Sequence, residues 1–120
     1  MAVPHLLSVG YDKSLMHSRA LVLRQAGFIV DLAFNLKGAL ALVKADSIDL
    51  LILCHTVSKK EQRQMIAAVR AQRKLLPIVC VNALDRDVSP QGCINTRNDP
   101  VELLDAVRRA ISSFRPPSHQ

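Results

Sequence analysis

Aromatic residues are scarce in this chain of 120 residues: they make up 3% of it, and there is no tryptophan. A core without large rings must be built from Leu, Ile, Val and Ala, and binding modes that stack bases on exposed rings are disfavoured. No apolar run reaches the about 18–20 residues that a membrane-spanning helix needs. The first residues, MAVPHLLSVG, lack the basic segment and cleavage site of a secretory signal, so we expect a cytoplasmic protein.

Cysteine chemistry is limited as well. Cys54, Cys80 and Cys93 are odd in number and form no C-x-x-C pair, which argues against a disulfide framework and against a zinc site. Neither a glycine-rich phosphate loop nor a nucleophile–base pair is apparent in the sequence. We therefore expect no enzymatic activity, no metal and no cofactor.

Positive charge is present in excess, and it is concentrated in one segment. The net charge is +6, and residues 58–74 contribute six basic residues against Glu61, a local balance of +5 (Lys59, Lys60, Arg63, Arg70, Arg73 and Lys74). Such a segment is either the solvated face of a helix or a surface for an acidic partner or for phosphates. No known DNA-binding motif accompanies it, so nucleic-acid contact through the 59–74 helix is an alternative and not the main interpretation.

Strand and helix patterns alternate along the whole chain. Strands are predicted at residues 5–9, 28–33, 48–54 and 76–81, with a short fifth strand at 92–95, and helices at about 13–26, 36–45, 59–73 and 100–114. Asp12, Asn35 and Asp99 are placed to cap helices, Gly27 to end one, and Ser58 with Glu61 to form a capping box. The run from Ile48 to Cys54 is apolar on both faces, as in a central parallel strand.

This alternation predicts an α/β fold, an open parallel sheet with helices on both faces. Ligands of such sheets lie beyond the carboxyl ends of the strands, where the strand order reverses. Functional residues are therefore expected just after Val9, Leu53 and Val81.

Five segments, taken in order, resemble the receiver domain of response regulators, the CheY-like module of two-component signalling. They are LLSVGYDKSL, QAGFIVDLAFNLKGALALV, DSIDLLILC, LPIVCVNA and NDPVELLDAVRRAI, and together they span nearly the whole chain. The resemblance implies a CheY-like (flavodoxin-like), doubly wound, five-stranded parallel sheet with strand order 2-1-3-4-5. Residues 1–115 would form the receiver-like domain, and residues 116–120 a disordered tail or linker stub.

The residues that would carry the family's chemistry differ here. Receivers hold Mg²⁺ with an acidic pair after the first strand, where this chain has Gly10 and Tyr11, leaving Asp12 as a remnant acidic residue. The resemblance places Cys54 where the family has its phosphorylated Asp, and a thiol cannot form an acyl phosphate. Asn82 replaces the hydroxyl residue at the end of the fourth strand, and Tyr11 is expected to fill the space of the lost acidic pocket.

The family's Lys after the fifth strand corresponds to Thr96, or to Arg97 if one residue is skipped. The aromatic residue that receivers rotate on activation corresponds to Cys93. Residues 83–91, ALDRDVSPQ, lack apolar periodicity, so the family's fourth helix is expected to be shortened or missing. The edge strand would then be more open and available for pairing with another chain.

These replacements predict a degenerate pseudo-receiver that is not phosphorylated on Asp and acts in signal transduction as a protein–protein interaction module. The expected partner is a protein of a signalling pathway or a second copy, bound through the fifth strand and the last helix; the residues concerned are Val88, Ile94, Arg97, Arg108 and Arg109. One alternative is a thiol-based sensor that uses Cys54, which requires exposure and a depressed thiol pKa. A packed, inert thiol is the competing interpretation of Cys54.

Overall fold

A computed structural model of the chain describes residues 3–44, 48–54, 56–82, 94–97 and 99–114. In this part of the chain nine elements follow one another: β1 (His5–Val9), α1 (Lys13–Gln25), β2 (Ile29–Ala33), α2 (Leu36–Lys44), β3 (Leu50–Leu53), α3 (Lys59–Gln72), β4 (Ile78–Asn82), β5 (Ile94–Arg97) and α4 (Pro100–Phe114). No helix within these ranges is long and apolar enough to cross a membrane.

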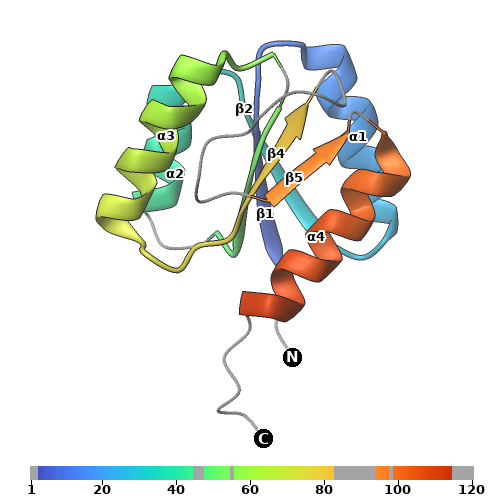
Figure 1. Ribbon diagram of the computed structural model, residues 1–120. Coiled ribbons are helices and arrows are strands. Elements are labelled where there is room, and N and C mark those ends of the chain that lie inside the picture. The colour runs from blue at the N-terminus through green and yellow to red at the C-terminus, as the bar shows by residue number, and fades with distance from the viewer. Residues whose placement is uncertain (1–2, 45–47, 55, 83–93, 98, 115–120) are drawn as a thin grey trace, which may run out of the picture.

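The five strands form one parallel sheet in the order β2-β1-β3-β4-β5, as the sequence predicts. The order reverses between β1 and β3, which are direct neighbours, so the carboxyl ends of these two strands form the switch point. Figure 1 shows α2 and α3 on one face of the sheet and α1 and α4 on the other.

Two apolar clusters fill the space between the sheet and these helix layers. One cluster joins Met16, Ala20 and Leu23 of α1 to α4 and to the strand side chains that face them. The other joins α2 and α3 to the opposite side chains of β1, β3 and β4. All four residues of β3 are buried, because this strand lies in the middle of the sheet and is covered on both faces.

Local sequence signals set the ends of most elements. The side chain of Asp12 accepts a hydrogen bond from the backbone of Leu15, and Ser58 and Glu61 form the predicted capping box of α3. Gly27 has φ of +103°, the left-handed conformation that ends the turn after α1. The predicted fifth strand is present over Ile94–Arg97 and ends two residues later than expected, because its pairing with β4 continues to Arg97.

Other predictions fall outside the described residues. The shortened or missing fourth helix concerns residues 83–93, and the proposed tail lies within residues 115–120. The domain bounds at 1–115 and 116–120 therefore stay predictions.

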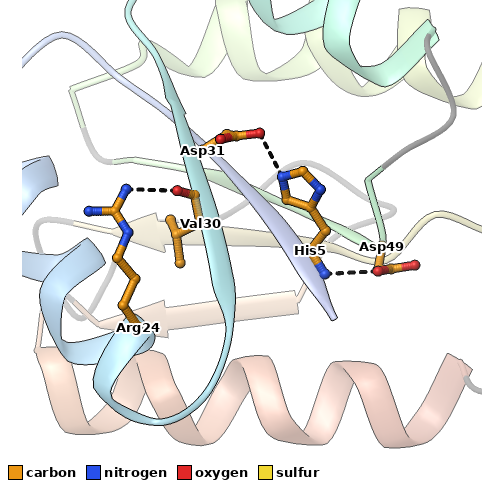
Figure 2. A network of polar contacts seen from close by, with 5 residues as sticks. All are labelled: His5, Arg24, Val30, Asp31 and Asp49. Carbon is orange, nitrogen blue, oxygen red and sulfur yellow. Dashed lines mark hydrogen bonds and ion pairs between the residues drawn. The ribbon is translucent and has the colours of Figure 1, made fainter. Parts of the chain in front are cut away.

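Polar contacts tie the amino ends of three strands together (Figure 2). The imidazole Nε2 of His5 lies 2.6 Å from a carboxylate oxygen of Asp31 on β2, and the backbone N–H of His5 donates to Asp49, just before β3. On the other side of β2, Arg24 at the end of α1 donates to the carbonyl oxygen of Val30, at 2.7 Å. These contacts lie away from the carboxyl ends of the strands, and they link neighbouring strands of the sheet.

Two arginines of the basic segment, residues 58–74, also form hydrogen bonds that stabilise the fold. Arg70 donates to the carbonyl oxygen of Leu76 at 2.6 Å, and Arg73 donates to the carbonyl oxygen of Ile48. Both bonds satisfy backbone acceptors around the connection from α3 to β4. These two arginines are therefore committed to the fold and do not contribute to a solvated basic face.

Replacing Arg70 with Ala is expected to lower the free energy of unfolding by about 1–2 kcal/mol, because the half-buried side chain bonds a carbonyl that then loses its partner. Arg63→Ala on the same helix is the matched control, since Arg63 is exposed, and it should change stability by less than about 0.5 kcal/mol. Urea unfolding followed by circular dichroism measures both. Equal effects of the two substitutions would contradict the structural role of Arg70.

Candidate functional site

The carboxyl ends of β1 and β3 are packed tightly against each other. The backbone N–H of Cys54 donates to the carbonyl oxygen of Val9 at 2.9 Å, which brings Cys54 beside Gly10. A Cβ added at Gly10 would lie 2.8 Å from the Cβ of Cys54 and 3.0 Å from the hydroxyl oxygen of Thr56. Since real Cβ atoms do not approach so closely, position 10 has no room for a side chain.

Cys54 faces inward at this edge of the sheet, toward α1. Its side chain is 1% exposed, and its sulfur lies 3.4 Å from the hydroxyl oxygen of Ser8. Burial raises the pKa of the Cys54 thiol above its ordinary value, against smaller opposing effects of Ser8 and of the Arg19 guanidinium. A buried thiol with a raised pKa has little thiolate at neutral pH, which is the environment of an inert cysteine.

Tyr11 lies over the surface of this edge and bridges two loops. Its backbone N–H donates to the hydroxyl oxygen of Thr56 at 2.9 Å, and its hydroxyl donates to Glu61 in the first turn of α3 at 2.7 Å. The side chain is 44% exposed, and its hydroxyl is bonded to the first turn of α3. That Tyr11 fills the space of the acidic pocket stays a prediction.

Asp12, the remnant acidic residue, has a structural role at the start of α1. One of its carboxylate oxygens accepts the backbone N–H of Leu15, so it serves as the N-cap of α1. A hard cation such as Mg²⁺ needs several oxygen ligands in one place. Within the described ranges, no three His, Cys, Asp or Glu side chains are grouped so that they could hold a metal ion.

The remaining predicted positions lie on β4 and β5. Asn82 is the last residue of β4 and pairs with Arg97, the last residue of β5. Thr96 precedes Arg97, pairs with Val81 and is 9% exposed. Arg97 therefore lies beside Asn82 at the carboxyl edge of the sheet, and Thr96 lies one residue before that edge. Both candidates for the family's Lys position are on β5.

The predicted interface residues are only partly described. Val88 lies outside the described residues, and for Ile94 and Arg97 only the strand position is given. Arg108 and Arg109 are exposed on α4, and Arg109 forms an ion pair with Asp105 at 3.3 Å. The rim on α4 that these two arginines were expected to form is therefore at the surface.

No protein-family model matches the sequence, and neither does any curated protein. Solved structures do match it over nearly its full length. A protein described as a response regulator from Chloroflexus aurantiacus is 25% identical, with a TM-score of 0.81, over 92% of this chain and 99% of that one. A receiver domain protein from Methanospirillum hungatei is 15% identical, with a TM-score of 0.79, over 94% and 97% of the two chains. Chemotaxis protein CheY4 of Vibrio cholerae is 23% identical, with a TM-score of 0.75, over 91% and 99%.

The chain has the fold of a response-regulator receiver domain. The predicted fold class and strand order are thereby confirmed. The identities with these structures are low, from 15% to 25%, so they bear on the fold and do not test the residues of the site.

Three residues of this receiver-like site were not predicted: Arg19, Thr56 and Glu61. Arg19 is 4% exposed beside Cys54, although it is charged. The sequence carries a signal for it, because Arg19 lies between Met16 and Leu23 at helical spacing, on the apolar side of α1. Glu61 was assigned to the capping box alone, and nothing in the sequence indicates that Tyr11, fifty residues earlier, also bonds to it.

Replacing Tyr11 with Phe is expected to raise the pKa of Glu61 toward its ordinary value, since the hydrogen bond from Tyr11 is the main cause of its lowered pKa. A carboxyl group whose pKa is lowered by folding stabilises the protein above its unfolded pKa of about 4.3, and this contribution is lost as the pH falls. Both groups are near the surface, so the loss in stability should stay below about 1 kcal/mol.

A carboxyl-carbon NMR titration of Glu61 in the native protein and in the Tyr11→Phe variant measures this shift directly. The amide signals of α4 are the internal control, and they should not move. An unchanged midpoint for Glu61 would show that the contact with Tyr11 is not formed in solution.

Proposed function

We propose that the chain is a degenerate receiver domain of two-component-type signal transduction. In this proposal it is not phosphorylated on aspartate, has no enzymatic activity and needs no cofactor, and it acts in the cytoplasm by binding another protein. The observation that carries the proposal is the close packing of Gly10 against Cys54, which leaves no room for an acidic side chain at position 10. The carboxylate of Asp12, the remnant acidic residue, already caps α1.

The first alternative, a thiol sensor at Cys54, is less well supported. A sensor cysteine needs access to its oxidant and a lowered pKa. Cys54 is buried, and its pKa is raised. The second alternative, nucleic-acid contact through the 59–74 helix, is weakened because Arg70 and Arg73 donate to backbone carbonyls of this chain. Among the classes considered, a protein-binding module agrees best with these contacts.

The partner is proposed to be a signalling protein or a second copy. The surface first expected for it, on β5 and the outer side of α4, has exposed Arg108 and Arg109 at its rim. This surface remains part of the proposal.

Incubation with Mg²⁺ and acetyl phosphate tests the proposal, with intact-mass spectrometry as the readout. The expected result is no acid-labile phosphoryl adduct, because the acceptor position holds a thiol and the acidic pair is absent. A receiver domain with an intact acidic pocket, treated in parallel, shows that the reagent is active. A stable phosphoprotein formed at an aspartate of this chain would overturn the proposal.

A further inference from the structure

The outer side of α3 forms a continuous exposed surface, which we call the α3 outer face. Its residues are spaced by three and four positions and are all exposed: Lys60, Arg63, Gln64, Ala67 and Ala71. The opposite side of the helix, with Met65, Ile66 and Val69, packs into the core. In Figure 1, α3 lies at the flank of the molecule, with α2 behind it.

The charge of this face is not neutralised by its own helix. Lys60 and Arg63 make no hydrogen bond or ion pair within the described part of the chain. The acidic residue of α3, Glu61, has both carboxylate oxygens engaged, one by the Tyr11 hydroxyl and one by the Ser58 backbone N–H. The turn after α3 adds exposed Lys74 and Leu75, the latter 78% exposed.

The charge of this face favours an occupant that carries negative charge. A second copy that presents its own α3 outer face would bring like charges together, so symmetric pairing through α3 is disfavoured. The chain as a whole has a net charge of +6, which also favours an acidic partner over a copy of itself.

The middle of the face is small and uncharged. Ala67 and Ala71 lie between Arg63 and the end of α3 at Gln72, a stretch of about 13 Å at 1.5 Å per residue. Arg70 is half-buried and donates to backbone carbonyls, so it adds no cation there. A nucleic acid would need cations along the whole surface to neutralise its phosphates. Small central residues instead allow another helix to pack here, with about 8 Å between the two helix axes.

We infer that the α3 outer face docks an amphipathic helix of a partner protein, with apolar residues over Ala67 and Ala71 and carboxylates facing Lys60 and Arg63. This is the helix-on-surface mode of recognition, in which residues at helical spacing act as anchors. The inference rests on the proposed function as a protein-binding module. It adds a second docking surface, separate from the one proposed on β5 and α4, and states the chemistry of the partner that binds there.

A synthetic helical peptide of about 18 residues, with leucines at its centre and glutamates toward one end, is the probe. Titration of the ¹⁵N-labelled protein is expected to move amide signals of residues 60–75 and to leave those of α4 in place. The double variant Lys60→Glu/Arg63→Glu should weaken binding about tenfold or more. Lys37→Glu/Lys44→Glu, an equal change of charge at exposed positions of α2, is the matched control and should bind as the native protein does.

The substitution Ala67→Arg distinguishes a helical partner from a nucleic acid. Arg is a good helix former, so the exposed substitution should leave the fold intact. Its bulk should abolish peptide binding, whereas a nucleic-acid surface would gain a cation and hold a duplex DNA more tightly at low salt. Tighter DNA binding by this variant would overturn the inference, as would peptide shifts outside α3 or none at all. Neither result would alter the outcome of the acetyl phosphate experiment, so the two proposals can fail separately.

Discussion

The Gly10→Asp variant is expected to lose about 3 kcal/mol or more of its free energy of unfolding and to bind no Mg²⁺. Its new Cβ would lie 2.8 Å from the Cβ of Cys54 and 3.1 Å from the sulfur of Met16. Gly10 is buried, so the carboxylate would also be withdrawn from water. Steric overlap and the burial of a charge are both among the mechanisms that produce large losses.

Two further variants separate these causes. Gly10→Ala keeps the steric overlap without the charge and should cost about 1–3 kcal/mol, as overpacking does. Tyr11→Asp puts a carboxylate at the neighbouring exposed position and should cost less than about 1 kcal/mol. Urea unfolding measures stability, and calorimetric titration with MgCl₂ measures binding. A stable Gly10→Asp variant that binds Mg²⁺ would show that the site is open in solution.

Gly10 and Cys54 are in close contact, and this contact limits which residues position 10 can hold. In this chain an acidic residue cannot be restored at position 10 alone, because the end of β3 occupies the space. The packing of each of these two positions therefore depends on the residue at the other. The Gly10→Asp variant tests this dependence directly.

The sequence predicted most of the fold because the signals for it are local. Ser58 and Glu61 define the start of α3, Gly27 ends the turn after α1, and the apolar run after Ile48 marks a central strand. The fifth strand ends two residues later than predicted, because its end depends on pairing with β4, which is distant in the sequence.

The candidate site was harder to predict for the same physical reason. Cys54 and Gly10 were identified from the resemblance, but their close contact needs β1 and β3 side by side. The bond from Tyr11 to Glu61 joins the loop after β1 to the first turn of α3. Nothing local in the sequence indicates it, because Glu61 already has a role in the capping box. Local patterns therefore reveal which residues are replaced, while the three-dimensional structure reveals how the replacements fit together.

Cys54 is expected to react with iodoacetamide at pH 7 at least about 100-fold more slowly in the native protein than in urea. Alkylation requires the thiolate and access to the sulfur. The side chain is 1% exposed, and burial raises its pKa, so both conditions are unfavourable. Modification should then proceed only through opening of the structure, at a rate that falls as stability rises.

The pH dependence of stability provides an independent check on the same thiol. A group whose pKa is raised by folding stabilises the protein below its unfolded pKa, about 8.5 for cysteine, and this contribution is lost as the pH rises. The free energy of unfolding should therefore fall above about pH 8.5, and Cys54→Ala should reduce this fall.

Mass spectrometry resolves the labelling at each cysteine, and buried Cys80 is the matched control in the same sample. Protection of both residues to a similar degree would indicate that Cys54 is a packed core residue. Fast labelling of Cys54 beside a protected Cys80 would instead support the thiol-sensor alternative, because it would require local access and a low thiol pKa at this position alone. The comparison thus separates a binding module with a closed site from a sensor with a reactive one, since only the sensor needs Cys54 to differ from Cys80.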